Sequence, residues 1–181
     1  MSLPASARGR RYLVAFLAVL TAGGLTAGGL ALAPGTAYAA SCSQAFLPLP
    51  DPSCQPGSYN PAVTQSTIGS TICVSGWTAT VRPPSSYTTA LKIQQIVEYG
   101  YSDTSTADYE EDHLVPLELG GAPKAATNLW PEPRSGTKTA ANKDTVENKL
   151  KAAVCAGTVT LSAARTAIKT NWMTALAKLG L

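Results

Sequence analysis

The sequence predicts a small α+β domain that is cross-linked by disulfides and preceded by a leader. The 181-residue chain less a leader of 39 residues leaves 142 residues, which is enough for one domain with its own core. Short runs rich in β-branched and aromatic residues alternate with longer runs of helical periodicity. Four cysteines follow the leader, an even number that is typical of a disulfide framework in an oxidising compartment.

Residues 1–39 have the features of a secretory signal peptide. Residues 8–11 read RGRR, a mostly apolar run extends over 12–33, and residues 37–39 read AYA, the small-x-small pattern of a signal-peptidase site. A basic start, an apolar middle and a small-residue end are the three parts of such a signal. The apolar run is about long enough to span a bilayer, but its two Gly-Gly pairs disfavour a transmembrane helix. We therefore expect a secreted, extracellular protein with no stable membrane association after cleavage.

The charges of the remaining chain are balanced in number but unevenly placed. Three of the 14 Lys and Arg residues lie in the leader, so 11 basic residues face 11 acidic ones after it. Eight of the acidic residues precede Ala122, whereas nine basic residues and three acidic ones follow it. A basic C-terminal half beside an acidic cluster suits a protein that binds an anionic polymer near a metal site. A solvated charged surface would give the same pattern.

The N-terminal part of the domain is predicted to be irregular and then β-rich. Residues 40–70 are rich in proline and poor in large apolar residues, which predicts an irregular arm, and residues 71–181 would form the domain proper. Residues 71–82, TICVSGWTATVR, alternate and contain many β-branched residues, which predicts strands with a turn at Ser75-Gly76. Pro83-Pro84 ends that pairing. Ser85 or Ser86 can then cap a helix that Gly100 ends.

Two extended segments and two helices are predicted to follow. HLVPLEL (113–119) reads as a strand or an extended turn, and NLWPEP (128–133) as a second extended segment. Residues 137–154 form a predicted helix, because apolar residues recur there every four positions and Gly157 follows as a stop. A last helix, capped by Ser162, would place one apolar stripe on the core. The stripe consists of Ile168, Trp172, Ala175, Leu176 and Leu179.

The four cysteines allow three pairings, of which we favour one. No CxxC spacing is present and the one histidine lies elsewhere, which argues against a structural zinc site. We predict a Cys42–Cys54 bridge that closes the Pro-rich loop and a Cys73–Cys155 bridge that ties an early strand to the end of a late helix. The chain-entropy estimate gives the longer loop about 3–5 kcal/mol of stabilisation.

The only histidine, His113, follows three acidic residues in the stretch YEEDHLVPLELGG. Its imidazole titrates near neutral pH, which makes it a natural general base. A carboxylate beside such a base, here Asp112, commonly holds a hard cation such as Mg²⁺ close to an activated water. Gly120-Gly121 allows a tight chain reversal behind the pair. The alternative is a surface histidine in an acidic loop.

The order of these motifs resembles the HNH, or ββα-metal (His-Me finger), nuclease family, and more closely its secreted bacterial members. The shared stretches cover most of residues 70–175: TICVSGWTATVRPPSSYTTALK, YEEDHLVPLELGG, NLWPEP and KDTVENKLKAAVCAG. In that family an Asp-His pair ends the first strand, an Asn begins the second, and a helix supplies a further metal ligand. The resemblance implies a ββα-metal core in which His113 deprotonates water, Asp112 binds the metal, and Asn128 braces the loop that aims His113.

The resemblance leaves the metal ligand on the helix open. The gap from the middle Asn to the helix is longer here than in the common family pattern, and no second histidine exists. At about 100° per residue, with Val146 taken as the centre of the apolar side, Asn142 shares that side, Glu147 lies at its edge, and Asp144 faces away. We therefore expect Asn142 first and Glu147 second as metal ligands. An ion pair of Glu147 with Lys143 or Lys151 is an equally good reading of that residue.

Together these observations predict a metal-dependent endonuclease that uses Mg²⁺ or Mn²⁺ to hydrolyse the phosphodiester bonds of DNA, or of RNA, with low sequence specificity. Arg134 is a candidate contact to phosphate. Trp130 and Trp172 are expected in the core rather than stacked on bases. Four lysines could follow the nucleic-acid backbone without reading sequence: Lys138, Lys149, Lys151 and Lys169. The alternatives are a non-catalytic, disulfide-stapled module that binds nucleic acid or another anionic polymer, and an inactive descendant of the nuclease fold.

Overall fold

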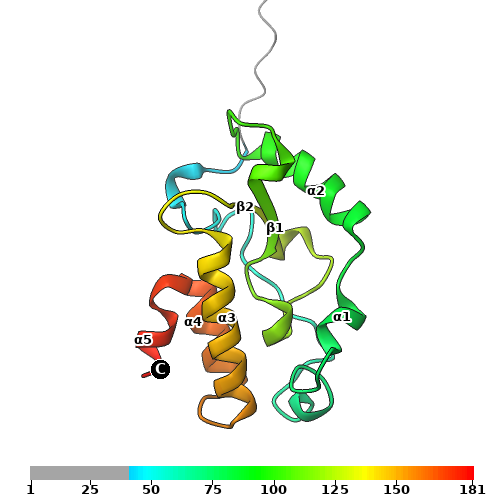
Figure 1. The fold of residues 1–181 in the computed structure, drawn as a ribbon, viewed down its shortest axis with the longest axis vertical. Coiled ribbons are helices and arrows are strands. Elements are labelled where there is room, and N and C mark those ends of the chain that lie inside the picture. Colours follow the sequence, from blue (N-terminus) through cyan, green and yellow to red (C-terminus); the bar gives the residue numbers. More distant parts are fainter. Residues whose placement is uncertain (1–40) are drawn as a thin grey trace, which may run out of the picture. The chain divides into compact units, whose positions relative to one another are not determined.

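The computed structural model describes residues 41–181, so the expected leader lies outside the described residues. These residues fold as an α+β unit in which a two-stranded antiparallel sheet is surrounded by helices and short 3-10 turns (Figure 1). Within 41–181, none of the helices combines the length and the apolar character that a membrane span needs. The elements are α1 (Trp77–Val81), α2 (Ser85–Glu98), β1 (Tyr109–His113), β2 (Leu129–Pro133), α3 (Ala140–Cys155), α4 (Leu161–Asn171) and α5 (Ala175–Lys178).

The predicted strands over residues 71–82 are wrong, because this segment forms turns and the short helix α1. Its hydrogen bonds are local, from Val74 N to Thr71 O at 2.8 Å and from Trp77 N to Val74 O at 3.2 Å. The turns bury Ile72 completely in the core and bring Cys73 to its disulfide partner. Tertiary packing therefore decides the conformation of a segment whose composition favours strands.

The first strand lies earlier in the chain than predicted. β1 ends at His113, and a 3-10 turn at Leu117–Leu119 follows where a strand or extended turn was expected. Pro116 cannot donate a hydrogen bond to a neighbouring strand, which disfavours strand pairing at this point. The second predicted segment is confirmed as β2. Pairing of Asp112 with Trp130 and of His113 with Leu129 sets the register of the two strands.

The C-terminal helices differ from prediction in their boundaries. α4 begins after Thr160, whose side chain accepts a hydrogen bond from Ala163 N at 3.2 Å, so Thr160 rather than Ser162 is the cap. The helix ends at Asn171, whose side chain caps a new turn by accepting from Met173 N at 2.9 Å. Despite this break, Ile168 and Trp172 are buried as predicted.

The main core packs α3 and α4 against the loop that follows β1. Leu150, Val154 and Ile168 from the helices and Val115 from the loop are all fully buried there. The Pro-rich arm is irregular, as predicted, yet it also contributes Val63 to this core.

Both predicted disulfides are confirmed. Cys42–Cys54 spans 12 residues and Cys73–Cys155 spans 82, and two such bridges are typical of a protein from an oxidising compartment. The longer bridge fixes the C-terminal end of α3 to the segment that precedes α1.

Candidate functional site

The end of β1 meets α3 through a buried lysine. Lys143 Nζ donates a hydrogen bond to Asp112 Oδ2 at 2.5 Å and to the His113 carbonyl oxygen at 2.8 Å, and it also donates to Glu147 Oε1. Lys143 is 0% exposed, and Asp112 and Glu147 are each 8% exposed. One ammonium group therefore joins two carboxylates that belong to different elements.

The geometry of α3 explains why Lys143 and Glu147 reach the same place. They are four residues apart and so project from one side of the helix, and the alternative of an ion pair between them is confirmed. Asn142, which was expected to face inward, is exposed, and it accepts a hydrogen bond from Thr139 N at 3.0 Å to close a capping box. The expected orientation was wrong because Val146 served as the reference. The buried side is centred about 60° away, near Lys143.

A second buried carboxyl, from β2, completes this acidic cluster. Glu132 is 0% exposed, and burial raises its pKa to about 10, helped by the charge of Asp112, so it is protonated near neutral pH. Burial also opposes ionisation of Asp112, but the Lys143 ammonium and the Glu132 carboxyl hold the pKa of Asp112 below its usual value. Burial raises the pKa of Glu147 to about 8, and the lysine opposes that shift. The result is an ionised Asp112 held by a permanently charged lysine.

His113 is buried and neutral. It is 4% exposed, and its Nε2 lies 3.0 Å from the carbonyl oxygen of Pro123. Because a carbonyl oxygen only accepts hydrogen bonds, Nε2 carries the proton and Nδ1 is left as the proton acceptor. Burial lowers the pKa of His113, although the Pro123 carbonyl and Asp112 partly offset it. The imidazole is thus in the form that a general base requires.

Asn128 holds together the loop that fixes His113. Its Oδ1 accepts from Val115 N at 3.0 Å, and its Nδ2 donates to Val115 O at 3.0 Å and to Ala122 O at 3.2 Å. One fully buried amide therefore ties the start of the loop to its end. The next residue after that end is Pro123, which accepts the hydrogen bond from His113. These contacts are the ones that a bracing role for Asn128 requires.

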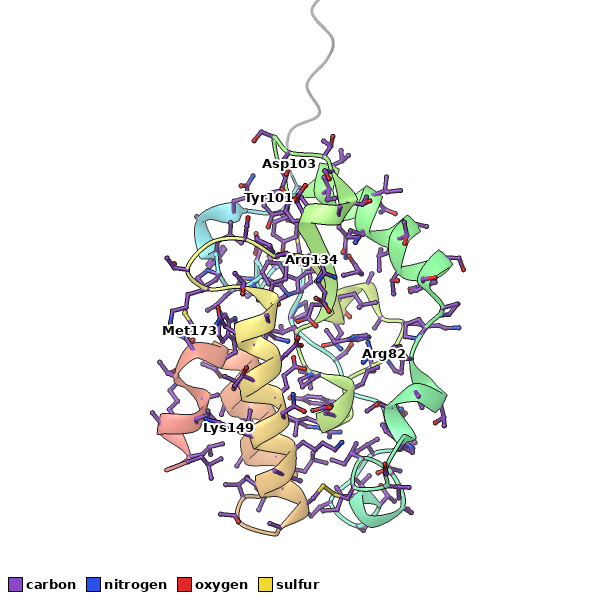
Figure 2. All side chains as sticks on the ribbon, in the orientation of Figure 1. Arg82, Tyr101, Asp103, Arg134, Lys149 and Met173 are labelled. Atoms are coloured by element: carbon purple, nitrogen blue, oxygen red, sulfur yellow. A yellow bond between two sulfur atoms is a disulfide. The ribbon has the colours of Figure 1, made fainter. Side chains whose placement is uncertain are left out.

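Two pockets meet at His113. The first, here called the acidic pocket, has a volume of about 90 Å³ and also contacts Arg82. Its carboxylate side chains are those of Glu110, Asp112, Glu118, Asp144 and Glu147. The second, here called the cationic cleft, has a volume of about 360 Å³ and contains Arg82, Lys92 and Arg134. Figure 2 shows Arg82 and Arg134 on the same side of α3. Alternation along β1 directs Asp112 toward α3 and Glu111 toward Lys92 of α2.

The acidic pocket fits a partly hydrated divalent cation. Asp112 and Glu147 each give one carboxylate oxygen to Lys143 and keep the other, and both residues line the pocket. Between residues 41 and 181, no three His, Cys, Asp or Glu side chains gather closely enough to hold an ion by themselves. Mg²⁺ commonly keeps several waters and uses one or two carboxylates together with substrate phosphates. Asp112 and Glu147 are therefore the residues that would hold it.

The other residues considered from the sequence lie outside these pockets. Trp130 and Trp172 are buried in the core, as expected. The four lysines expected to follow a nucleic-acid backbone do not line the acidic pocket or the cationic cleft. Lys169 lies over the Tyr59 ring, 5.6 Å from its centroid, and Figure 2 shows Lys149 across α3 from Arg82. Arg82 and Lys92 were not singled out, because only the fold brings them to Arg134.

Comparison of the chain with protein-family models, with curated proteins and with solved structures gave no match. The functional interpretation therefore rests on the geometry of these side chains.

Proposed function

We propose that the protein is a secreted, divalent-cation-dependent endonuclease of the HNH, ββα-metal type that hydrolyses phosphodiester bonds of DNA or RNA. The observation that carries the proposal is His113, a buried neutral imidazole with one nitrogen fixed and the other available. It stands between a pocket of carboxylates and a cleft of cations. Metal-dependent hydrolysis of a phosphodiester uses a general base to activate water and a cation to stabilise the charge that develops on the phosphate.

The chain order also supports the family assignment. Asp112 and His113 end β1, Asn128 directly precedes β2, and α3 follows with the residues that meet Asp112. This is the ββα order of the proposed family. Export is supported by the features of residues 1–39 and by the two disulfides.

The chain's own residues divide the chemical work. His113 Nδ1 takes the proton of a water molecule as that water attacks phosphorus, and the Pro123 carbonyl stabilises the resulting imidazolium through Nε2–H. Asp112, ionised next to His113, adds electrostatic stabilisation of that cation. A bound Mg²⁺ or Mn²⁺ supplies Lewis-acid stabilisation of the charge that develops on the phosphate and on the leaving oxygen. Lys143 keeps Asp112 in place throughout.

Cleavage of supercoiled plasmid DNA and of a labelled RNA by the wild type and by His113→Ala tests the proposal. In Mg²⁺ or Mn²⁺ the wild type should cut, and EDTA should stop it. His113→Ala should be slower by about 10²–10⁴-fold, the usual contribution of a general base, at a temperature where thermal melts show both proteins to be folded. Equal cleavage by both proteins after identical purification would remove His113 as the base.

A non-catalytic binding module is the second candidate, and Lys143 favours it. The lysine already neutralises Asp112 and hydrogen-bonds to Glu147, so the cluster is stable as it stands. A binding module would bind DNA equally with and without EDTA, would tolerate His113→Ala, and would leave plasmid DNA intact.

A further inference from the structure

The cationic cleft is built from segments that are far apart in the sequence. Arg82 precedes α2, Lys92 lies within α2, and Arg134 follows β2. The cleft meets the acidic pocket at His113, and Arg82 and Glu110 also line both. A ligand in the cleft would therefore extend directly to the imidazole.

The charges of the cleft are not balanced. Across residues 41–181, neither Arg82 nor Lys92 has a carboxylate within 4.0 Å, whereas Arg134 pairs with Glu110 at 3.1 Å. Lys92 Nζ is instead held by two backbone carbonyl oxygens, those of Thr106 at 2.7 Å and Tyr109 at 2.9 Å. Its ammonium is thus fixed in position by carbonyl oxygens, while Glu110 and Glu111, which also line the cleft, lie beyond ion-pair distance from it.

Lys92 and Arg134 also lie close enough for their positive charges to repel each other. Burial lowers the pKa of Lys92 and the charge of Arg134 lowers it further, while Glu111 and Glu110 offset only part of this shift. Bringing like charges together costs free energy, which a bound anion would recover. Ser85, Thr88 and Thr89 from the start of α2 line the same cleft, and the hydroxyl groups of Ser85 and Thr89 add hydrogen-bond donors for oxygen atoms.

We infer that the cationic cleft binds a phosphodiester group of the nucleic-acid strand, adjacent to the phosphodiester that is cleaved at His113. The inference rests on the proposed function and adds a substrate-binding site on the α2 side of the sheet. Guanidinium groups donate paired hydrogen bonds to phosphate oxygens. Contacts to phosphate position a strand without reading its bases, which accounts for low sequence specificity.

Fluorescence anisotropy of a labelled DNA oligonucleotide in EDTA, over a series of salt concentrations, tests the inference. Arg82→Ala and Arg134→Ala should each weaken binding about tenfold, the value of one charged hydrogen bond. Each should also reduce the slope of log K against log salt concentration by about 1. Lys178→Ala, which removes one exposed charge from α5, should change neither quantity.

Lys92→Met is a third variant for the same binding experiment. A thermal melt checks that it is folded, because Lys92 is half-buried. Wild-type affinity and slope in both arginine variants would overturn the inference. The measurement needs no cleavage, so the two proposals fail separately. Binding through the cleft without plasmid cleavage refutes only the nuclease, whereas cleavage by a wild type whose arginine variants bind normally refutes only the cleft.

Discussion

Gly121 shows at the residue scale why two glycines follow the histidine. A Cβ atom on Gly121 would lie 1.7 Å from the Val115 carbonyl oxygen and 2.9 Å from Asn128 Nδ2. Gly120 has a φ of +71°, a left-handed conformation that other residues adopt at a cost. The loop can therefore close on Asn128 only with glycine at these positions. The motif around His113 could be recognised from the sequence because its residues are close together in the chain. The contact of Lys143 with Asp112 could not, because it joins residues that only the fold brings together.

Substitution of Gly121 by alanine should open this loop. The methyl group would collide with backbone, so we expect a loss of about 2–4 kcal/mol in the free energy of unfolding, measured by chemical denaturation. Gly69→Ala is the control, since nothing lies within 4 Å of a Cβ there, and it should change stability by less than about 1 kcal/mol. Equal denaturation midpoints for the two variants would contradict the role of Gly121.

At the element scale, the Lys143 ammonium group ties the sheet to α3. The spacing of apolar residues predicted α3, and its face was misplaced because Val146 is only half-buried while Lys143 is fully buried. Predicting the buried face of a helix from its apolar residues assumes that charged residues face water. Lys143 is an exception, because Asp112 and Glu147 are its partners inside the protein. The strand prediction for residues 71–82 was wrong for a related reason. The Cys73–Cys155 disulfide and the buried side chain of Ile72 outweigh the local preference for strand.

Replacing Lys143 with methionine should separate β1 from α3. The change leaves Asp112 and Glu147 without their cation, and breaking such a buried pair costs about 3–5 kcal/mol. A divalent cation can then take the place of the ammonium, so Mn²⁺ should raise the melting temperature of Lys143→Met more than that of the wild type. Lys149→Met, on the exposed side of the same helix, should resemble the wild type. A Lys143→Met protein as stable in EDTA as the wild type would refute this tie.

At the scale of the whole molecule, buried acids make stability depend on pH. Burial raises the pKa of Glu111 to about 8 and that of Glu132 to about 10, and both oxygens of each carboxyl are buried. Nothing in the sequence distinguishes these acids from the exposed ones, because burial is decided by the packing of α2 and α3 on the strands. The disulfide pairing, by contrast, was predictable from the positions of the loops it closes.

The sign of the pH effect follows from these raised pKa values. The folded state keeps protons that the unfolded chain loses above about pH 4.5, so the stabilisation is complete below that pH and is lost as the pH rises through about 8. The free energy of unfolding should therefore fall between pH 5 and pH 8, as urea denaturation at several pH values would show. Glu111→Gln should make the decline shallower. A free energy of unfolding that rises across this range would contradict the assignment.

Location of Mn²⁺ by anomalous scattering in crystals of the protein tests most directly whether His113 works beside a metal ion. We expect a peak in the acidic pocket at coordination distance from Asp112 and Glu147, with Lys143 still hydrogen-bonded to the opposite oxygens. A map at saturating Mn²⁺ with no peak beside Asp112, or with peaks only at the surface, would contradict a metal-dependent hydrolase.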